Sequence, residues 1–271
     1  MKFDLHLHSR HSPDSKSKVK DIIDKALRTE LQGVSITDHN CFDGSEEALS
    51  INTSDLIIVP GAEYSTDQGH ILVYFLKYGI EKLNLDTDSM GRYRWQDIIQ
   101  EAHRQDALAF LAHPYRYKKN YESDIWQEVD GIEIYNSRAA LCRNMNANLR
   151  AFEQASEMNK AFSAGSDGHW LGEIGNAFWE YENIKENKTD INEEIKQALR
   201  SGKGKVFGSA TNRFYEPSSQ IFKRLHARKY LNLPKPLIKM AYACVMETGR
   251  YLGIGEKPME GWLDIDSNEK E

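Results

Sequence analysis

Short apolar runs alternate with segments of helical period along most of this chain, and this alternation constrains the fold more than any other feature. Runs rich in Val, Ile and Phe predict strands at Phe3–His8, Val34–Thr37, Leu56–Glu63, His70–Phe75, Leu108–Ala112, Ile132–Tyr135, Phe162–Gly165 and Ala177–Tyr181. Segments of helical period predict helices at Val19–Leu31, Gly44–Ile51, Trp95–Gln105, Ala140–Asn159 and Asn192–Ser201. Repeated strand–helix units of this kind indicate an α/β fold.

Nearly every predicted strand begins or ends near a side chain that can bind a metal ion. His6 and His8 lie two residues apart on the first strand, so their imidazoles point to the same face. Alone, such a pair is weak evidence, but the same kind of residue recurs along the chain. The further candidates are Asp14, His39, Glu63, His70, His113, Asp167 and His169.

These nine positions are expected to converge in the folded chain. In a barrel of parallel strands, the carboxyl ends of the strands meet on one face, and that face carries the active site. Polar residues are common at loop junctions, which explains one or two such positions but not an ordered set of imidazoles and carboxylates. The sequence therefore predicts a metal site, and its mixed nitrogen and oxygen ligands suit zinc, manganese or iron alike.

The charge of the chain is uneven. Residues 213–239 contain seven Lys or Arg and one acid, whereas the whole chain of 271 residues has a formal net charge of −6. The strand pattern also stops at about Phe207. We therefore expect an α/β domain at residues 1–211 and a helical carboxy-terminal extension at residues 212–271. In the extension we expect a basic helix, a second helix at Leu237–Leu252 and a loose acidic end after Gly261.

The basic stretch has two interpretations. Its cations, interleaved with Phe214, Tyr215, Phe222 and Tyr230, are able to guide single-stranded nucleic acid to the metal face. Alternatively, apolar residues such as Ile221 pack the extension onto the acidic domain as a helical flap, with the cations paired to carboxylates. We favour the flap, because basic runs are usually solvated or paired. A small phosphorylated substrate is accordingly favoured over a nucleic-acid polymer.

The polar motifs also occur together in a known family. They are His6-Leu7-His8, Asp14, Thr37-Asp38-His39-Asn40, Gly61-Ala62-Glu63, Gly69-His70, Ala112-His113-Pro114 and Gly165-Ser166-Asp167-Gly168-His169. Over residues 1 to about 210, this ordered set resembles the PHP (polymerase and histidinol phosphatase) domain family, and most closely its stand-alone metal-dependent phosphoesterases. The resemblance implies a distorted (β/α)7 TIM-like barrel, here with a helical carboxy-terminal extension, and a trinuclear metal site.

The resemblance further implies a ligand set for each of three divalent ions. One ion would be held by His6, His8, Glu63 and Asp167. A second would be held by Glu63, His70 and His113, so that Glu63 bridges the two. A third would be held by Asp14, His39 and His169. Within these sets we expect Glu63, Asp167 and His169 to take part in catalysis.

Hydrolysis of a phosphate ester fits such a site. Two closely spaced divalent ions lower the pKa of a shared water and offset the charge of the phosphoryl oxygens, so no protein nucleophile is required. Positive or polar side chains near the ligands should then hold the phosphate, and a guanidinium matches its geometry. The candidates, each just beyond or at the end of a predicted strand, are Arg116, Asn136 and Arg138.

We therefore predict an enzyme that hydrolyses a phosphomonoester of a small nucleotide-like or metabolite substrate by a metal-bridging hydroxide. The alternatives are an exonuclease or phosphodiesterase on short oligonucleotides, a histidinol phosphate phosphatase, a metal-dependent amidohydrolase and a non-catalytic module that binds metal or phosphate. No run approaches the roughly 18–20 apolar residues of a membrane span, and no apolar signal region follows Met1. We expect a cytoplasmic protein without a membrane partner, and the sequence indicates no oligomeric state.

Overall fold

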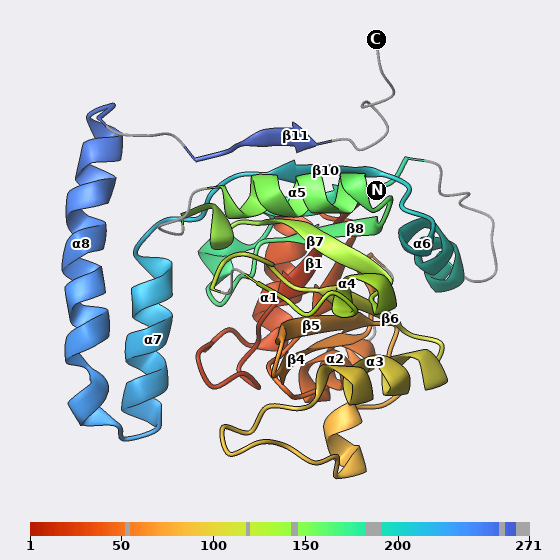
Figure 1. Ribbon diagram of the computed structural model, residues 1–271. Helices are drawn as coiled ribbons and strands as arrows, with labels where there is room; N and C mark the ends of the chain where they lie inside the picture. The colour runs from red at the N-terminus through yellow and green to blue at the C-terminus, as the bar shows by residue number, and fades with distance from the viewer. Residues whose placement is uncertain (52–54, 118–119, 142–145, 183–190, 255–257, 264–271) are drawn as a thin grey trace.

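The computed structural model describes residues 1–51, 55–117, 120–141, 146–182, 191–254 and 258–263. One of its two sheets contains β1 (Lys2–Leu7), β2 (Gly33–Ile36), β3 (Ile57–Ile58), β9 (Ala177–Glu180), β10 (Lys205–Gly208) and β11 (Gly261–Leu263), in the order β11-β10-β9-β1-β2-β3. The other contains β4 (Gly61–Thr66), β5 (Gly69–Tyr74), β6 (Leu108–Leu111), β7 (Gly131–Asn136) and β8 (Ala161–Gly165), in chain order. Figure 1 shows the strands at the centre of the molecule, with helices around them.

The α/β class is confirmed, but the predicted (β/α)7 TIM-like barrel is not, because the described strands form two sheets and no closed barrel. Among the described strands, β1–β2–β3 and β6–β7–β8 pair in parallel. The β4–β5–β6 and β1–β9–β10–β11 pairs are antiparallel. The expected strand Leu56–Glu63 is divided at Pro60, which has no backbone N–H to donate, so its two halves join different sheets.

The two sheets adjoin at the carboxyl ends of their parallel strands. Isolated parallel bridges join Leu7 to Gly168 and His39 to Glu63. The backbone N–H of His8 donates to Gly168 O at 2.9 Å, which fixes the segment after β8 beside β1. The predicted ligands therefore lie where the two sheets meet.

The predicted helices of the α/β domain are present, with bounds that differ from the predicted ones. The helices are α1 (Val19–Arg28), α2 (Asp43–Ser50), α3 (Trp95–Arg104), α4 (Ile125–Glu128), α5 (Ala147–Glu157) and α6 (Ile191–Arg200), with short 3-10 segments η1 (Ile80–Leu83), η2 (Ala139–Leu141) and η3 (Leu171–Glu173). In α1, the apolar stripe is buried as its spacing predicts. The expected helix Ala140–Asn159 corresponds to η2 and α5, and residues 142–145 between them lie outside the described ranges.

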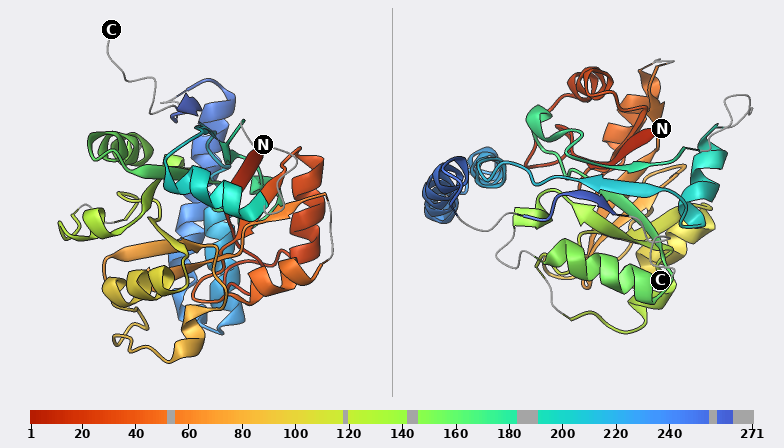
Figure 2. Two further views of the ribbon diagram at one scale, coloured as in Figure 1. Left: turned by 90° about the vertical axis from the view of Figure 1, so that its right-hand side faces the viewer. Right: turned by 90° about the horizontal axis from the view of Figure 1, so that it is seen from above.

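The extension forms a helical hairpin of α7 (Tyr215–His226), η4 (Tyr230–Asn232) and α8 (Pro234–Tyr251). Both views in Figure 2, together with Figure 1, place this pair of antiparallel helices along one side of the α/β domain. The end after Gly261 was expected to be loose, but its first residues form β11, which pairs antiparallel with β10. Residues 264–271 lie outside the described residues. Within the described ranges, none of the helices combines the length and apolar character needed to cross a membrane.

Candidate metal centre

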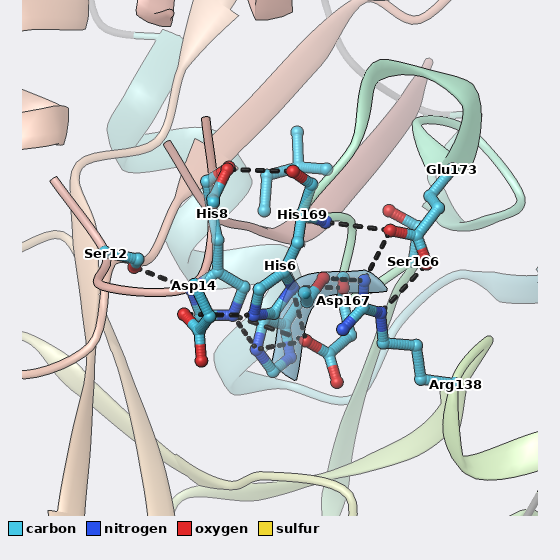
Figure 3. Close-up of polar contacts among 12 residues, drawn as sticks. His6, His8, Ser12, Asp14, Arg138, Ser166, Asp167, His169 and Glu173 are labelled. Carbon is cyan, nitrogen blue, oxygen red and sulfur yellow. Dashed lines mark hydrogen bonds and ion pairs between the residues drawn. The ribbon is translucent and has the colours of Figure 1, made fainter. Parts of the chain in front are cut away.

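All nine predicted ligand positions come together where the two sheets meet, in a mostly buried cluster. Figure 3 labels His6, His8, Asp14, Asp167 and His169 among them. The imidazoles of His6, in β1, and of His8, directly after it, are fully buried, with their Nε2 atoms 3.2 Å apart. Glu63 is also fully buried, although it is a carboxylate. Buried charges of this kind require charged or metal partners. The other positions surround these three: Asp14, His39, His70, His113, Asp167 and His169.

Four ligand atoms share the spacing of a single metal site. Glu63 Oε2 lies 3.5 Å from His6 Nε2 and 3.4 Å from His8 Nε2. Asp167 Oδ1 lies 3.8 Å and 3.3 Å from the same two nitrogens. Ligand atoms around one tetrahedral ion, at about 2.0–2.2 Å from it, are separated by roughly 3.3–3.6 Å. The distances therefore suit one ion held by these four side chains.

The two oxygens of Glu63 face different groups of imidazoles. Oε2 lies 2.8 Å from His39 Nδ1 and also faces His6 and His8, whereas Oε1 lies 2.7 Å from His70 Nδ1 and 3.1 Å from His113 Nε2. Burial by itself would raise the pKa of this carboxyl, but the neighbouring imidazoles, chiefly His70 and His39, hold the pKa of Glu63 well below its usual range. The carboxylate is therefore ionised and has the geometry of a bridging ligand.

Asp14 lies between two imidazoles at the outer side of the cluster. Its Oδ1 atom is 3.4 Å from His169 Nε2, and its Oδ2 atom is 3.7 Å from His39 Nε2. The Nζ atom of Lys223, from α7, is 2.9 Å from Asp14 Oδ2. Burial raises the pKa of Asp14, but His39, His169 and Lys223 lower it by more. The pKa of Asp14 therefore lies below its ordinary value.

Three histidines are held with their Nε2 lone pairs toward the cluster. The Nδ1 atom of His6 lies 2.8 Å from Glu133 Oε1, and that of His169 lies 2.9 Å from a backbone carbonyl oxygen. His8 Nδ1 lies 3.1 Å from Ser12 Oγ, whose hydroxyl donates to Asp38. An Nδ1–H that donates to an acceptor leaves Nε2 deprotonated, as a metal ligand requires.

Buried polar atoms without a well-aligned hydrogen bond, although within ion-pair distance of one another or of His169, also suit a cation at the same place. Among the described residues, the buried atoms without a hydrogen-bond partner include Glu63 Oε2, Asp14 Oδ1 and His39 Nδ1. Buried polar atoms are normally satisfied, and these three all belong to the cluster. The donor set of imidazole nitrogens and carboxylate oxygens fits divalent transition metals.

Two of the candidate ligands follow strands at residues with positive backbone φ. His113 follows β6 with φ of 27°, and Asp167 follows β8 with φ of 54°. Residues other than glycine rarely adopt this left-handed region, and such strain is concentrated at functional sites. The turns direct both side chains back toward the carboxyl ends of the strands.

Sequence reasoning missed two buried glutamates that position other residues. Glu133, on β7, accepts from His6 Nδ1 and, at 2.7 Å, from the backbone N–H of His113. Glu173 accepts the backbone N–H of His169 at 3.0 Å and also binds Arg138. The sequence did carry a sign of the role of Glu133, because it is the only charged residue in the apolar strand Gly131–Asn136.

The three residues expected to hold phosphate each contact an acid or amide within the protein. Arg116 forms an ion pair with Asp167. Arg138 forms a two-point pair with Glu173, with N–O distances of 2.8 Å and 2.6 Å (Figure 3). Asn136 is fully buried, and its amide donates to Glu133 at 3.1 Å. Both arginines line the open cleft beside the ligands, whereas Asn136 does not.

The cleft has a volume of about 750 Å³ and joins the cluster to the helical extension. Its floor includes Asp14, His39, His70, His113, Asp167 and His169, and its opposite wall is formed by residues of α7, η4 and α8. Two of the remaining histidines are directed elsewhere: His11 contacts Glu47 and His103 contacts Asp130. The ligand candidates on the floor of the cleft are therefore accessible to a small molecule, and His70 and His113 also line a second, smaller pocket.

Comparison with known proteins agrees with this arrangement. The family model for the PHP domain matches residues 4–208. An uncharacterized protein of Methanocaldococcus jannaschii is 30% identical over 199 residues, which cover 70% of this chain and 74% of the relative. A probable histidinol-phosphatase of Thermotoga maritima is 30% identical over 132 residues, which cover 43% of this chain and 57% of that protein.

A solved structure shows the same fold at low sequence identity. It is a two-domain protein of Bacteroides vulgatus, described as containing a predicted PHP-like metal-dependent phosphoesterase, with a TM-score of 0.59 and 19% identity. The match covers 77% of this chain and 65% of that protein, so this chain spans less than two thirds of its length. With the family model matching most of its length, the chain belongs to the PHP domain family.

Proposed function

We propose that this chain is a metal-dependent phosphoesterase that hydrolyses phosphomonoesters of small nucleotide-like or metabolite substrates. The observation that carries the proposal is the placement of Glu63, a fully buried carboxylate whose two oxygens face different imidazoles, several of which line an open cleft. A buried carboxylate shared in this way is typical of two-metal hydrolytic sites.

The residues divide into three proposed ligand sets. The first is His6, His8, Glu63 and Asp167; the second is Glu63, His70 and His113; and the third is Asp14, His39 and His169. Bound divalent ions supply two things here: a lowered pKa for water and compensation of the charge on the phosphoryl oxygens. Manganese, zinc and iron all suit the donor atoms.

The protein's own side chains orient the ligands and receive the phosphate. Glu133 and Ser12 fix the tautomers of His6 and His8, which keeps the Nε2 atoms available. Arg116 lines the cleft and contacts Asp167, so its guanidinium lies next to the phosphate site and binds the charged oxygens. We assign catalytic roles to Glu63, Asp167 and His169.

Arg138 is the weaker candidate for phosphate binding, because its guanidinium makes a two-point pair with Glu173 and a further hydrogen bond to Ser219. Asn136 is proposed to orient Glu133 and Asp167 through its amide, at 3.1 Å and 3.4 Å, since it does not line the cleft. These two residues therefore support the floor of the site.

A substrate panel tests the proposal. Protein loaded with manganese or zinc should release orthophosphate from at least one of a set of nucleotide and sugar phosphomonoesters. Histidinol phosphate belongs in the set because of the Thermotoga relative. The panel should also contain a phosphodiester, a short oligonucleotide, an amide and a lactone. Activity confined to the amide or the lactone would overturn the proposed chemistry.

A further inference from the structure

The extension forms one wall of the cleft that contains the ligand candidates. Glu216, Ser219, Gln220 and Lys223 of α7 follow the spacing of a single helix face, and all four line the cleft. Ser219 Oγ accepts hydrogen bonds from Arg138 at 3.1 Å and from the indole of Trp170 at 2.9 Å, beside the ligand cluster. The family match ends at residue 208, so this wall lies outside the part of the chain that the family model describes.

Some of the cations on this wall are paired with acids. Lys223 Nζ lies 2.9 Å from Asp14 Oδ2, and Lys239 Nζ lies 3.0 Å from Glu216 Oε1. The Lys223–Asp14 pair joins the extension to the α/β domain, as the predicted flap requires, whereas the Lys239–Glu216 pair joins α8 to α7 within the extension. They bring α7 and α8 into contact with the cleft.

Three further cations of the same wall are not accounted for by such pairing. We call them the outer cation group, and all three line the cleft: Arg224, Lys229 and Lys235. In the part of the chain that the structure describes, no carboxylate oxygen lies within 4.0 Å of their charged nitrogens. Among the described residues, the guanidinium of Arg224 donates a hydrogen bond from Nη1 to the backbone oxygen of Gln220, at 2.9 Å.

We propose that the outer cation group binds a second phosphate group of the substrate, while the metal centre holds the phosphate that is hydrolysed. This inference rests on the proposed phosphoesterase function. A phosphate carries about −1.5 to −2 charge at pH 7 and offers three acceptor oxygens. Cations without acidic partners in a concave wall attract such a group strongly.

The alternative is that these cations only balance the acidic domain. Cations with that role lie beside carboxylates of the domain, as Lys223 does beside Asp14. A monophosphate needs only the metal centre and Arg116, which leaves the outer cation group without a function. A second phosphate explains why the unpaired cations gather on the wall opposite the ligands.

The test compares matched substrates with one and two phosphates. Metal-loaded protein is assayed with fructose 1,6-bisphosphate against fructose 6-phosphate, and with 5′-phosphorylated dithymidine against thymidine 5′-monophosphate. We expect kcat/KM to be at least tenfold higher for the two-phosphate member of one pair. The pair with the larger ratio shows whether the second phosphate comes from a small bisphosphate or from a nucleic-acid backbone.

A triple variant assigns that ratio to the outer cation group. In R224A/K229A/K235A, the ratio of the two kcat/KM values should fall at least tenfold. In the charge-matched control K18A/K20A/R28A, whose exposed positions on or next to α1 do not line the cleft, the ratio should be unchanged. Calorimetric titration of chelator-treated protein gives a second readout, in which tighter binding of the two-phosphate substrate should disappear only in the first variant.

The outcomes separate this inference from the proposed function. If wild-type protein hydrolyses monophosphates but neither pair shows a preference, or if both triple variants keep the same ratio, the second phosphate site is overturned and the phosphoesterase stands. If the protein hydrolyses no phosphoester in either pair or in the wider panel, the proposed function fails, and this inference fails with it.

Discussion

The proposed metal centre depends most on the side chain of Glu63. Its oxygens face two groups of imidazoles, so Glu63→Gln removes a charge that two ions would share. We expect metal content, measured by elemental analysis, to fall from about three ions per chain to about one, with loss of turnover. His103→Gln is the control, because His103 contacts Asp130 at the surface. A Glu63→Gln protein that retains all of its metal would contradict the bridging role.

Glu133 acts on the metal centre through another residue. It accepts from His6 Nδ1 at 2.8 Å and from the backbone of His113, so Glu133→Gln leaves one of these donors without its charged acceptor. Loss of such an orienting carboxylate typically weakens metal binding about 10–100-fold. We expect that loss in a competition titration with a chromogenic chelator. Glu47→Gln, outside the cluster, should leave the affinity unchanged.

At the residue scale, the positions that gather in the cluster were predictable and the contacts that support them were not. An imidazole or carboxylate at a strand end is visible in the sequence because its spacing follows the strands. The path of residues 166–173 decides which acid lies opposite Arg138. The pairing of Arg138 with Glu173 was therefore not visible in the sequence. Asn136 was likewise expected to meet substrate, but it donates to Glu133 on its own strand.

At the scale of elements, the close approach of β8 to β1 shapes the centre. A Cβ atom on Gly165 would lie 2.3 Å from the Cβ of His6 and 2.6 Å from its backbone nitrogen. Gly165→Ala therefore forces the two strands apart. We expect a loss of about 1–3 kcal/mol in the free energy of unfolding, measured with denaturant, together with weaker metal binding.

The matched control for that substitution is Gly249→Ala on α8. An added Cβ there meets only a backbone oxygen, Ile254 O, at an ordinary 3.5 Å. Because alanine favours a helix over glycine by roughly 0.8–1 kcal/mol, this variant should be equally stable or more stable. Equal destabilisation by both substitutions would show that Gly165 has no special role in packing.

The elements themselves were largely predictable, whereas their grouping was not. Apolar periodicity located most strands and helices, because local burial sets that period. The division into two sheets depends on the interruption at Pro60 and on antiparallel pairing by β9, β10 and β11. Strands as short as Gly261–Leu263 carry no readable period, so β11 was expected to be loose.

At the scale of the whole molecule, the metal centre joins the two sheets. His6 and His8 come from the first sheet, whereas Glu63 and His70 come from the second. Bound ions therefore cross-link the sheets and should stabilise the folded state, by about 2.7 kcal/mol at a free metal concentration 100 times Kd. We expect thermal unfolding to shift upward with manganese and downward with a chelator. The shift should shrink in Glu63→Gln, and a Tm indifferent to metal would contradict this role.

The central claim is that hydrolysis of a phosphoester requires the ions bound at this cluster. The most direct measurement is the rate of orthophosphate release by chelator-treated protein during stepwise addition of manganese, with the best phosphomonoester of the panel. We predict no release without metal and a rate that reaches its maximum at about three equivalents per chain. Release that persists in full after the metal has been removed would contradict the account.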